Sequence, residues 1–333
     1  MAFTSSLLNI TDPTIRQPPP GQIRSYPSPT STGKIPFTVP SFKDVQSETW
    51  YALFGTLSSG SIPLIVLHGG PGACHNYLKT LSLLSIGPHA RPVILYDQIG
   101  CGNSTRFRER RKDDEFWQPQ LFIDELNNLV QSLGIKQFDL LGQSWGGMLG
   151  AQYATTRPAG LRKLVIADSP TDMATWVAVA NEMRSLLPED VQKTLNRCEE
   201  EGRTDTEEYE AAVLEFYRWF VCRVDPMPKE FVETMEHLKE DDTVYFTMNG
   251  PSEFHVIGNL KTWDTKPELG KIQVPTLLIN GKFDEAQDVV MEPFFKGIKS
   301  PLKWVRFAES SHLPQLEETE DFMLTVGKFL DED

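Results

Sequence analysis

Short apolar runs and longer segments of helical periodicity alternate along much of the chain. Several runs are apolar almost throughout, which is typical of strands buried on both faces of a sheet: IPLIVLHGG (62–70), RPVILYDQ (91–98), QFDLLG (137–142) and LRKLVIAD (161–168). SETWYALFG (47–55) instead alternates like an exposed strand. Helical spacing appears at 118–135, and the small apolar segment 145–158 is typical of a buried helix. This alternation predicts an α/β fold, with a mostly parallel sheet flanked by helices.

The alternation stops near Ser169 and resumes at VPTLLINGKFD (274–284). Between these points the chain is charged, helical in pattern and rich in aromatic residues, as in YEAAVLEFYRWFVCRV (209–224). We interpret this part as a helical cap inserted before the strand at 274–284. Such a cap would cover the carboxyl ends of the strands, where open α/β sheets bind ligands.

These changes of character divide the chain into four parts. Residues 1–32 are rich in Pro, Ser and Thr, and they predict a loosely ordered leader along the surface. We expect the first part of the α/β core at 33–169, the helical cap at 170–268 and the second part of the core at 269–333. This last part predicts a strand, a loop and a closing helix after the strand at 274–284.

Composition and charge restrict the partners of the chain. Of its 333 residues, 40% are hydrophobic and 23% are charged, and the length allows one or two domains with a large core. The formal net charge of −14 argues against nucleic acid or an anionic membrane as a partner. It is compatible with a cationic substrate.

The sequence carries no recognisable targeting or metal-binding signal. Its first residues lack the basic region and apolar run of a secretory signal, and no apolar stretch approaches the ~20 residues of a membrane span. The cysteines (Cys74, Cys101, Cys198 and Cys222) lie far apart without C-x-x-C spacing. Neither a disulfide framework nor a zinc site is indicated. We expect a cytosolic protein that needs no metal and no organic cofactor.

One serine lies between two glycines, directly after a predicted strand. Gly142-Gln143-Ser144-Trp145-Gly146 fits G-x-S-x-G, the strand-to-helix turn that exposes a nucleophilic serine. The alternative is close packing of a strand against a helix, which also favours glycine. A nucleophilic serine requires a base to take its proton and an acid to orient that base.

The histidines after Ser144 are His237, His255 and His312. His312 lies in a polar loop after the apolar run KWVRF, where a base at a strand end is expected. His237 lies in a charged helical pattern, which predicts a surface residue. His255 lies in the cap and is a candidate to line a pocket. We predict His312 as the base.

The acid is expected in the loop that follows the preceding strand. Asp284 ends TLLINGKFD and occupies this place. Asp168, which ends LVIAD, is the alternative acid, although it also fits a turn or a helix cap before Pro170. We favour Asp284.

An oxyanion hole needs two backbone N–H groups directed at the developing negative charge. One comes from the residue after the nucleophile, which is Trp145. The other comes from a loop after an early strand, and HGGPG (68–72) is such a loop. A tight turn that requires positive φ is the alternative interpretation of these glycines.

Together, the segments HGGPGACHNYL, YDQIGCGNST, GQSWGG, GKFDE and ESSH resemble the proline iminopeptidase family of α/β-hydrolases. The resemblance extends from about residue 35 to the C-terminus and includes the cap. It implies an α/β-hydrolase fold, with Ser144, Asp284 and His312 as the catalytic triad. It also implies that Gly70 and Trp145 donate to the oxyanion.

The resemblance adds two carboxylates that would bind the free amine of a substrate. MNGPSEFHVIGNLKTWD (248–264) is similar to a family segment whose amine-binding glutamate matches Glu253. A second such glutamate follows the catalytic aspartate, and this position is Glu285. Paired carboxylates suit an ammonium group because they form charge-assisted hydrogen bonds with it. From the residues alone, Glu253 also fits the start of a cap helix and Glu285 a solvated loop charge.

Some features lie outside the resemblance or weaken it. The leader lies outside the resemblance, and Phe283 stands where the family often has Tyr. No residue identifies a pocket for a pyrrolidine ring, and Cys74 and Cys101 are interpreted as packing residues. Aromatic residues of the cap that are candidates to line a pocket are Trp176, Phe216, Tyr217, Trp219, Tyr245 and Phe246.

These features predict a serine hydrolase, an aminopeptidase or amidase that acts through an acyl-enzyme. It would release an N-terminal amino acid, with proline as one candidate, from short peptides or amino-acid amides with a free amine. An esterase, lactonase or biosynthetic acyl hydrolase with the same triad and no amine requirement is the main alternative. A ligand-binding receptor with a hydrolase fold is a second alternative, and the complete triad argues against it.

Overall fold

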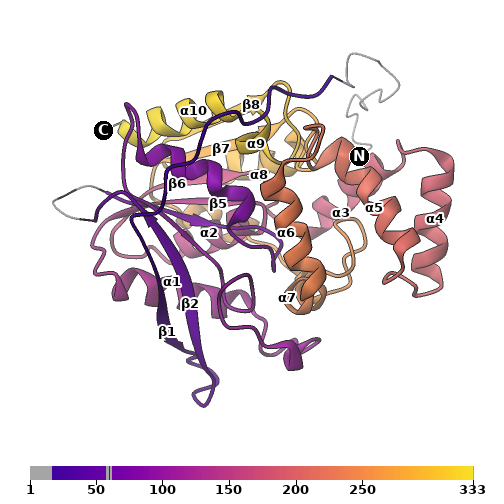
Figure 1. Cartoon of the computed structure of the whole chain (residues 1–333), viewed down its shortest axis with the longest axis horizontal. Coiled ribbons are helices and arrows are strands. Elements are labelled where there is room, and N and C mark those ends of the chain that lie inside the picture. The colour runs from indigo at the N-terminus through magenta and orange to yellow at the C-terminus, as the bar shows by residue number, and fades with distance from the viewer. Residues whose placement is uncertain (1–16, 58–59, 61, 333) are drawn as a thin grey trace.

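An eight-stranded sheet with the order β1-β2-β4-β3-β5-β6-β7-β8 organises the chain (Figure 1). The structure is a computed structural model that describes residues 17–57, 60 and 62–332. β1 pairs antiparallel with β2, and β2 with β4, whereas β4, β3, β5, β6, β7 and β8 are parallel to one another. The strands span Ser31–Thr38 (β1), Gln46–Phe54 (β2), Leu64–Leu67 (β3), Val93–Tyr96 (β4), Phe138–Gln143 (β5), Leu161–Ala167 (β6), Thr276–Gly281 (β7) and Leu302–Phe307 (β8). The predicted, mostly parallel sheet is confirmed.

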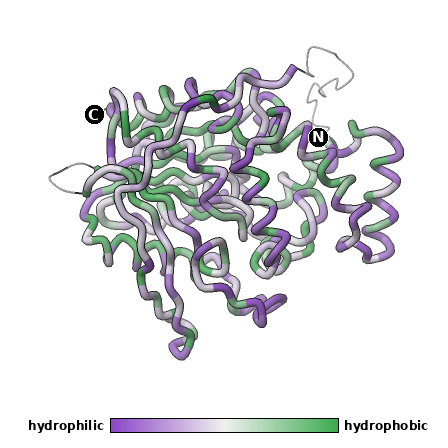
Figure 2. The backbone as a smooth tube through the Cα atoms, viewed as in Figure 1, coloured by the Kyte–Doolittle hydropathy of each residue, from purple (hydrophilic) through white to green (hydrophobic). Residues whose placement is uncertain are grey.

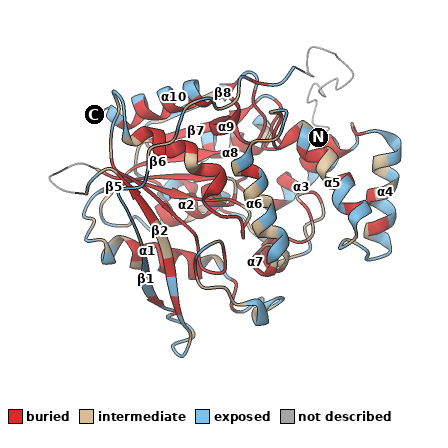
Figure 3. Cartoon of the chain, viewed as in Figure 1, coloured by how far each residue is buried: buried red, intermediate tan, exposed pale blue. Residues whose placement is uncertain are grey.

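The central strands are buried on both faces of this sheet. Every residue of β3, β4, β5 and β7 is buried, and successive side chains of a strand point to opposite faces. Helices therefore cover both faces, and Figure 3 shows the strands as buried beneath partly exposed helices. The 3-10 helix η1 (Asn76–Ser85) contacts α10 (Thr319–Asp331), and α1 (Pro119–Ser132) contacts α2 (Trp145–Thr155). This double burial is the reason that the strands appear in the sequence as continuous apolar runs.

A group of helices is inserted between β6 and β7, as the sequence predicts, and lies to one side of the sheet (Figure 1). These helices are α3 (Met173–Arg184), α4 (Glu189–Glu200), α5 (Glu207–Phe220), α6 (Lys229–Glu240), α7 (Thr243–Met248), η3 (Asn259–Thr262) and η4 (Lys266–Lys271). Most residues of α4 are hydrophilic, and this helix lies at the far end of the group (Figure 2). The boundaries of the four-part division remain a proposal. The helix η4 extends across the proposed boundary between the cap and the second part of the core, after residue 268.

The parallel arrangement brings the loops after the strands to one edge of the sheet. Ser144 directly follows β5, and Asp284 lies in the loop between β7 and α8 (Asp288–Gly297). His312 lies between β8 and the short helix α9 (Pro314–Glu317). Because the carboxyl ends of parallel strands meet at the same edge, residues far apart in the sequence come together there.

The N-terminal part differs from the prediction. β1 begins at Ser31, inside the proposed leader, and residues 1–16 of that leader lie outside the described residues. β1 was not predicted because STGKIPFT contains Gly and Pro, which are tolerated in an edge strand but weaken the strand pattern. β2, predicted as an exposed strand, alternates in burial only over its first four residues and is mostly buried after them, and β1 pairs with its outer edge.

Candidate active site

Ser144 occupies a strained turn between β5 and α2, with φ 57° and ψ −123°. A Cβ atom on Gly142 would lie 2.0 Å from the Gly146 carbonyl oxygen, and one on Gly146 would lie 2.2 Å from the Leu67 carbonyl oxygen. Both glycines of the motif are thus required for close packing, and the packing holds a non-glycine residue in an unfavourable conformation. Such strain is characteristic of a nucleophile turn.

His312 and Asp284 form a buried pair next to this turn. The Nδ1 atom of His312 lies 2.7 Å from Oδ1 of Asp284, which also accepts a hydrogen bond of 2.8 Å from the Ala286 N–H. Since a carboxylate can only accept, Nδ1 carries the proton and Nε2 is left as a proton acceptor. His312 and Ser144 line the same cavity, so this geometry suits a base that acts on the serine.

Asp168, the alternative acid, lies at the end of β6 with φ 53° and is fully buried. Its burial and the charge of Asp284 raise the pKa of Asp168 well above its usual range. The neutral form of Asp168 is therefore favoured beside Asp284, while the imidazole of His312 contacts Asp284. Between the two candidates, the contacts favour Asp284.

Glu317 holds the loop that carries His312, a role that the sequence did not reveal. Its carboxylate accepts hydrogen bonds from the Ser311 N–H (2.7 Å), the Ser311 hydroxyl (2.8 Å) and the Leu313 N–H (3.3 Å). The Arg223 N–H, in the segment after α5, donates a fourth at 2.8 Å. Burial raises the pKa of Glu317 to about 7. In the sequence, Glu317 is one of several acidic residues near the C-terminus, and nothing local distinguishes it.

The glycine loop after β3 leaves the Gly70 N–H available. The Gly69 carbonyl oxygen accepts from Nδ1 of His68 (3.0 Å) and from the Ala73 N–H (3.3 Å), so the Gly70 N–H of the same peptide points the other way. Gly70 has φ 109°, which favours glycine. In the part of the chain that the structure describes, no hydrogen bond has the N–H of Gly70 or of Trp145 as its donor. Both are therefore free to bind an oxyanion.

His68 is neutral and determines how this loop is held. Its Nε2 accepts from the Gln98 N–H at 2.9 Å, so the proton lies on Nδ1, which donates to the Gly69 oxygen. Burial lowers the pKa of His68 to about 4. The Gln98 side chain donates to the His68 carbonyl oxygen and accepts from Nε1 of Trp145, each at 2.9 Å. Gln98 thereby links the two segments that supply the free N–H groups.

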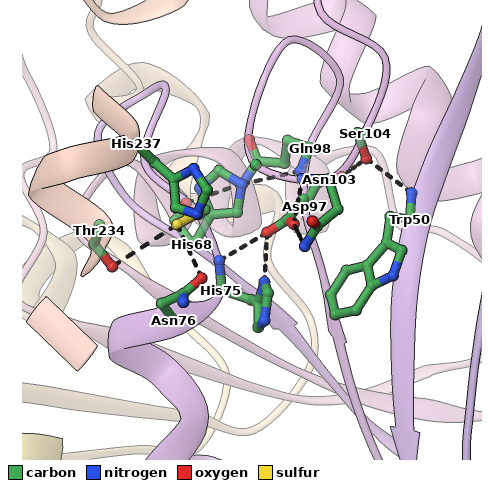
Figure 4. A network of polar contacts seen from close by, with 12 residues as sticks. Trp50, His68, His75, Asn76, Asp97, Gln98, Asn103, Ser104, Thr234 and His237 are labelled. Carbon is green, nitrogen blue, oxygen red and sulfur yellow. Dashed lines mark hydrogen bonds and ion pairs between the residues drawn. The ribbon is translucent and has the colours of Figure 1, made fainter. Parts of the chain in front are cut away.

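Asp97, directly after β4, anchors the neighbouring loops (Figure 4). Its Oδ1 accepts from the N–H and from Nδ1 of His75, both at 2.8 Å, and its Oδ2 accepts from the N–H and side chain of Asn103 at 2.8 and 3.0 Å. Burial favours the neutral acid, but the charge and hydrogen bond of His75 outweigh it and lower the pKa of Asp97 to about 2. The segment from Asp97 to Ser104, part of the YDQIGCGNST motif, thus stabilises the loops around the site.

Glu253 and Glu285 line the same cavity as Ser144. Oε1 of Glu253 accepts from the Tyr245 hydroxyl at 2.7 Å, and Oε1 of Glu285 lies 3.8 Å from Nε2 of His312. Oε2 of Glu285 is buried without a hydrogen-bond partner among the described residues. Burial raises the pKa of both carboxyl groups. No lysine or arginine of residues 17–57, 60 and 62–332 forms an ion pair with either, so the pair can receive a cation from outside.

The cavity is small, about 60 Å³, and part of its lining is apolar, formed by Val221, Phe231, Met235 and Leu238. Of the aromatic candidates, Tyr217 and Tyr245 line it. The other four do not line it. Nε1 of Trp176 donates to the Glu253 carbonyl oxygen at 3.0 Å, and Phe216 packs against Phe220 and Phe254. Trp219 packs against the core, and Phe246 lies under the guanidinium of Arg111.

The other two histidines that follow Ser144, His237 and His255, do not line the cavity. His255 lies 3.8 Å from Glu199 of α4 and is not among the lining residues, so its candidacy is wrong. His237, on α6, contacts Arg106 at 3.2 Å and is part-buried. Cys74 and Cys101 are buried, and burial raises the pKa of the Cys74 thiol to about 12, which leaves it protonated and unreactive.

Comparison with known proteins agrees with this geometry. The model of the α/β hydrolase fold family matches residues 62–319. The proline iminopeptidase of Heyndrickxia coagulans is 38% identical over 274 residues, which cover 82% of this chain and 92% of that protein. The chain belongs to the proline iminopeptidase family of α/β hydrolases. The family membership confirms the fold that the resemblance implied, and it makes the protein an enzyme, a serine hydrolase, rather than a receptor.

Two solved structures are similar over nearly the whole chain. The crystal structure of VinJ is 44% identical with a TM-score of 0.85, and the match covers 91% of this chain and 99% of that one. The proline iminopeptidase of Mycobacterium smegmatis is 40% identical with a TM-score of 0.80, covering 90% and 97%. No helix of the described residues has the length and the apolar character that a membrane span requires.

Proposed function

We propose that this proline iminopeptidase family member is an exopeptidase that releases an N-terminal residue, proline among them, from short peptides or amino-acid amides. The observation that carries the proposal is the pair of buried carboxyl groups, Glu253 and Glu285, on the wall of the cavity that Ser144 and His312 also line. A substrate ammonium bound there would lie close to the nucleophile. The names of the relatives support proline as a released residue.

The reaction would proceed through an acyl-enzyme. The Ser144 hydroxyl oxygen attacks the carbonyl carbon of the first residue while Nε2 of His312 takes its proton, and Asp284 stabilises the imidazolium. The N–H groups of Gly70 and Trp145 bind the negative oxygen of the tetrahedral intermediate. When the C–N bond breaks, His312 gives the proton to the leaving nitrogen. Water then attacks the ester by the same route and releases the free amino acid.

The carboxylate pair would select for a free amine. Burial raises the pKa of each carboxyl group, and the charge of Glu253 raises that of Glu285 further. An ammonium group would favour the ionised forms of both and form charge-assisted hydrogen bonds with them. An N-acetylated substrate has no charge to offer, so it would leave the pair uncompensated. The esterase and lactonase alternatives have no use for such a pair, and the named relatives do not favour them.

The substitutions Glu253→Gln and Glu285→Gln test the proposal. Each should lower kcat/KM for a free-amine substrate by about 30- to several thousand-fold, because a charge-assisted contact in a closed pocket is lost. An uncharged ester of similar size does not use the pair, so its kcat/KM should hardly change. Wild type should prefer an aminoacyl amide over its N-acetylated form by a similar factor.

Chromogenic amide and ester substrates of matched size give both rates with each enzyme. Ser144→Ala is the inactive control, expected to lose on the order of 10⁴–10⁶ in rate with both. Equal losses on amide and ester would mean that the glutamates only support the fold or Asp284. If wild type shows no preference for a free amine, the esterase alternative replaces the proposal.

A further inference from the structure

We propose that Tyr77 and Gln143 form a positioning relay that holds the glycine loop after β3 and the His312 loop in place on either side of Ser144. The Gly69 N–H donates to the Tyr77 hydroxyl oxygen at 2.7 Å, and that hydroxyl donates to Oε1 of Gln143 at 2.6 Å. Nε2 of Gln143 then donates to the His312 carbonyl oxygen at 2.9 Å. Both side chains are buried, and neither belongs to the triad.

The direction of every hydrogen bond in this relay is determined by its two ends. The Gly69 N–H can only donate, and the His312 carbonyl oxygen can only accept. The Tyr77 hydroxyl must therefore direct its proton to Gln143, and the Gln143 amide must direct its nitrogen to His312. Phe in place of Tyr77, or an apolar residue in place of Gln143, breaks the relay and leaves buried polar groups unpaired.

The relay also fills the space around the nucleophile. A Cβ atom on Gly69 would lie 2.9 Å from the Tyr77 hydroxyl, 3.0 Å from Oε1 of Gln143 and 3.0 Å from Cβ of Ser144. Tyr77 and Gln143 line the cavity together with Ser144 and His312. Gly69 therefore packs directly against the relay, and a side chain there would press on the hydroxyl and the amide.

The relay fixes one side of the peptide that precedes the free Gly70 N–H. In the peptide between His68 and Gly69, the oxygen is held by Gln98 and the N–H by Tyr77. This peptide therefore cannot rotate, and the next one presents its Gly70 N–H to the cavity. At the other end, Gln143 holds the carbonyl of the residue that supplies the base. A donor misplaced by a fraction of an ångström contributes less to the transition state, which is why the support of the oxyanion hole matters.

This inference rests on the proposed reaction at Ser144, and it applies to any acyl transfer there, with or without an amine. Tyr77→Phe should lower kcat/KM by about 10- to 100-fold on both a free-amine amide and an uncharged ester, less than loss of an oxyanion donor itself. The loss should fall on kcat, since the substrate pocket keeps its shape. An aldehyde inhibitor, which forms a tetrahedral adduct with Ser144, should lose affinity by a similar factor, whereas the affinity for free proline should stay within about threefold.

Gln143→Met and the double variant test whether the two residues act as one unit. The kcat/KM of the double variant should be close to that of the less active single variant, because either substitution already breaks the relay. Tyr153→Phe is the matched control: Tyr153 is buried, and its hydroxyl donates to Asn127 at 3.0 Å away from the cavity. Its loss of stability should resemble that of Tyr77→Phe, with kcat/KM unchanged.

Tyr77→Phe activity within about threefold of wild type on both substrates, or an equal loss in Tyr153→Phe, would overturn the relay. A wild type that cleaves the ester but not the free-amine amide would contradict the proposed exopeptidase and leave the relay to be judged on the ester. Labelling of Ser144 by a fluorophosphonate distinguishes failure of the relay from failure of both proposals. If Ser144 does not label, both proposals fail; if it labels as fast in Tyr77→Phe as in wild type, the relay alone fails.

Discussion

At the scale of single residues, two neighbouring aspartates differ in their contacts. Asp284 accepts from His312 and from the Ala286 N–H, which suits an ionised carboxylate. Asp168 is fully buried, and neither of its oxygens accepts a hydrogen bond from the described residues. As a protonated acid it can donate to Asp284, which leaves the charge on the group that contacts the base. The same residue type thus has two roles, determined by its neighbours.

Substituting each aspartate by asparagine should separate these roles. Asp284→Asn should cost about 10⁴-fold in kcat/KM, because the amide favours the wrong tautomer of His312. Asp168→Asn should cost little, since a neutral amide can still donate to Asp284. Steady-state kinetics on one substrate, with thermal unfolding to verify that both variants are folded, gives the comparison. The reverse order of losses would assign the acid to the loop after β6.

At the scale of elements, the loop between β8 and α9 depends on a buried carboxylate rather than on a regular structure. Glu317 accepts from groups on both sides of His312 and from the Arg223 N–H, which belongs to the segment after α5. The leader reaches the same place, since the Gly21 N–H donates to the Glu317 carbonyl oxygen at 2.8 Å. Leader, cap and core therefore meet behind the base.

Glu317→Gln should loosen this loop. An amide has one oxygen to accept with, and its nitrogen would face N–H donors, so at least one donor next to His312 would be unpaired. We expect kcat/KM to fall by about 10- to 100-fold and the free energy of unfolding to fall by about 1–3 kcal/mol. Chemical denaturation and kinetics measure both.

Glu199→Gln is the control for this prediction, because Glu199 accepts from Arg184 and from the Tyr209 hydroxyl within the cap. It should lose stability and keep its kcat/KM. If Glu317→Gln loses stability alone, as the control does, then Glu317 does not position the base.

At the scale of the whole molecule, several acidic residues are buried so deeply that their pKa values are raised. They include Glu125, at about 8, and Glu317, at about 7, both raised by burial, together with Asp139, Asp168, Glu253 and Glu285. Between the ordinary pKa and the raised one, the folded protein binds a proton that the unfolded chain has released. Stability therefore falls as pH rises through this range. Asp97, with its pKa lowered to about 2, acts in the opposite sense and loses its contribution only in strong acid. His68, with its pKa lowered from 6.5 to about 4, also acts in the opposite sense below pH 6.5, but the carboxyl groups with raised pKa outnumber it.

The free energy of unfolding should therefore decrease as pH rises from about 5 to about 8, which denaturation at a series of pH values would measure. Glu125→Gln should flatten this dependence, since it removes a group whose pKa moves from 4.5 to about 8, and one unit corresponds to about 1.4 kcal/mol. Glu240→Gln, a change at an exposed carboxylate, is the control and should leave the slope unchanged. A stability that rises over this range would contradict the prediction.

The sequence by itself determined those features that depend on local burial and local turns. The parallel strands appear as apolar runs because both of their faces are covered, and the turn at Ser144 requires glycine on either side. The fold class, the inserted cap and the family follow from such patterns. The triad and the amine-binding glutamates remain predictions about chemistry, although their side chains lie around one cavity, with Asp284 behind His312.

Only the tertiary structure decided the features that depend on residues far apart in the sequence. The preference for Asp284 over Asp168 follows from which loop reaches the imidazole, and β1 exists because β2 offers it an edge. Gln143 contacts Tyr77 from 66 residues away and His312 from 169 residues away. No pattern of neighbouring residues encodes such contacts. They form because the parallel strands end at a common edge, where each side chain finds its partner across the sheet rather than along the chain.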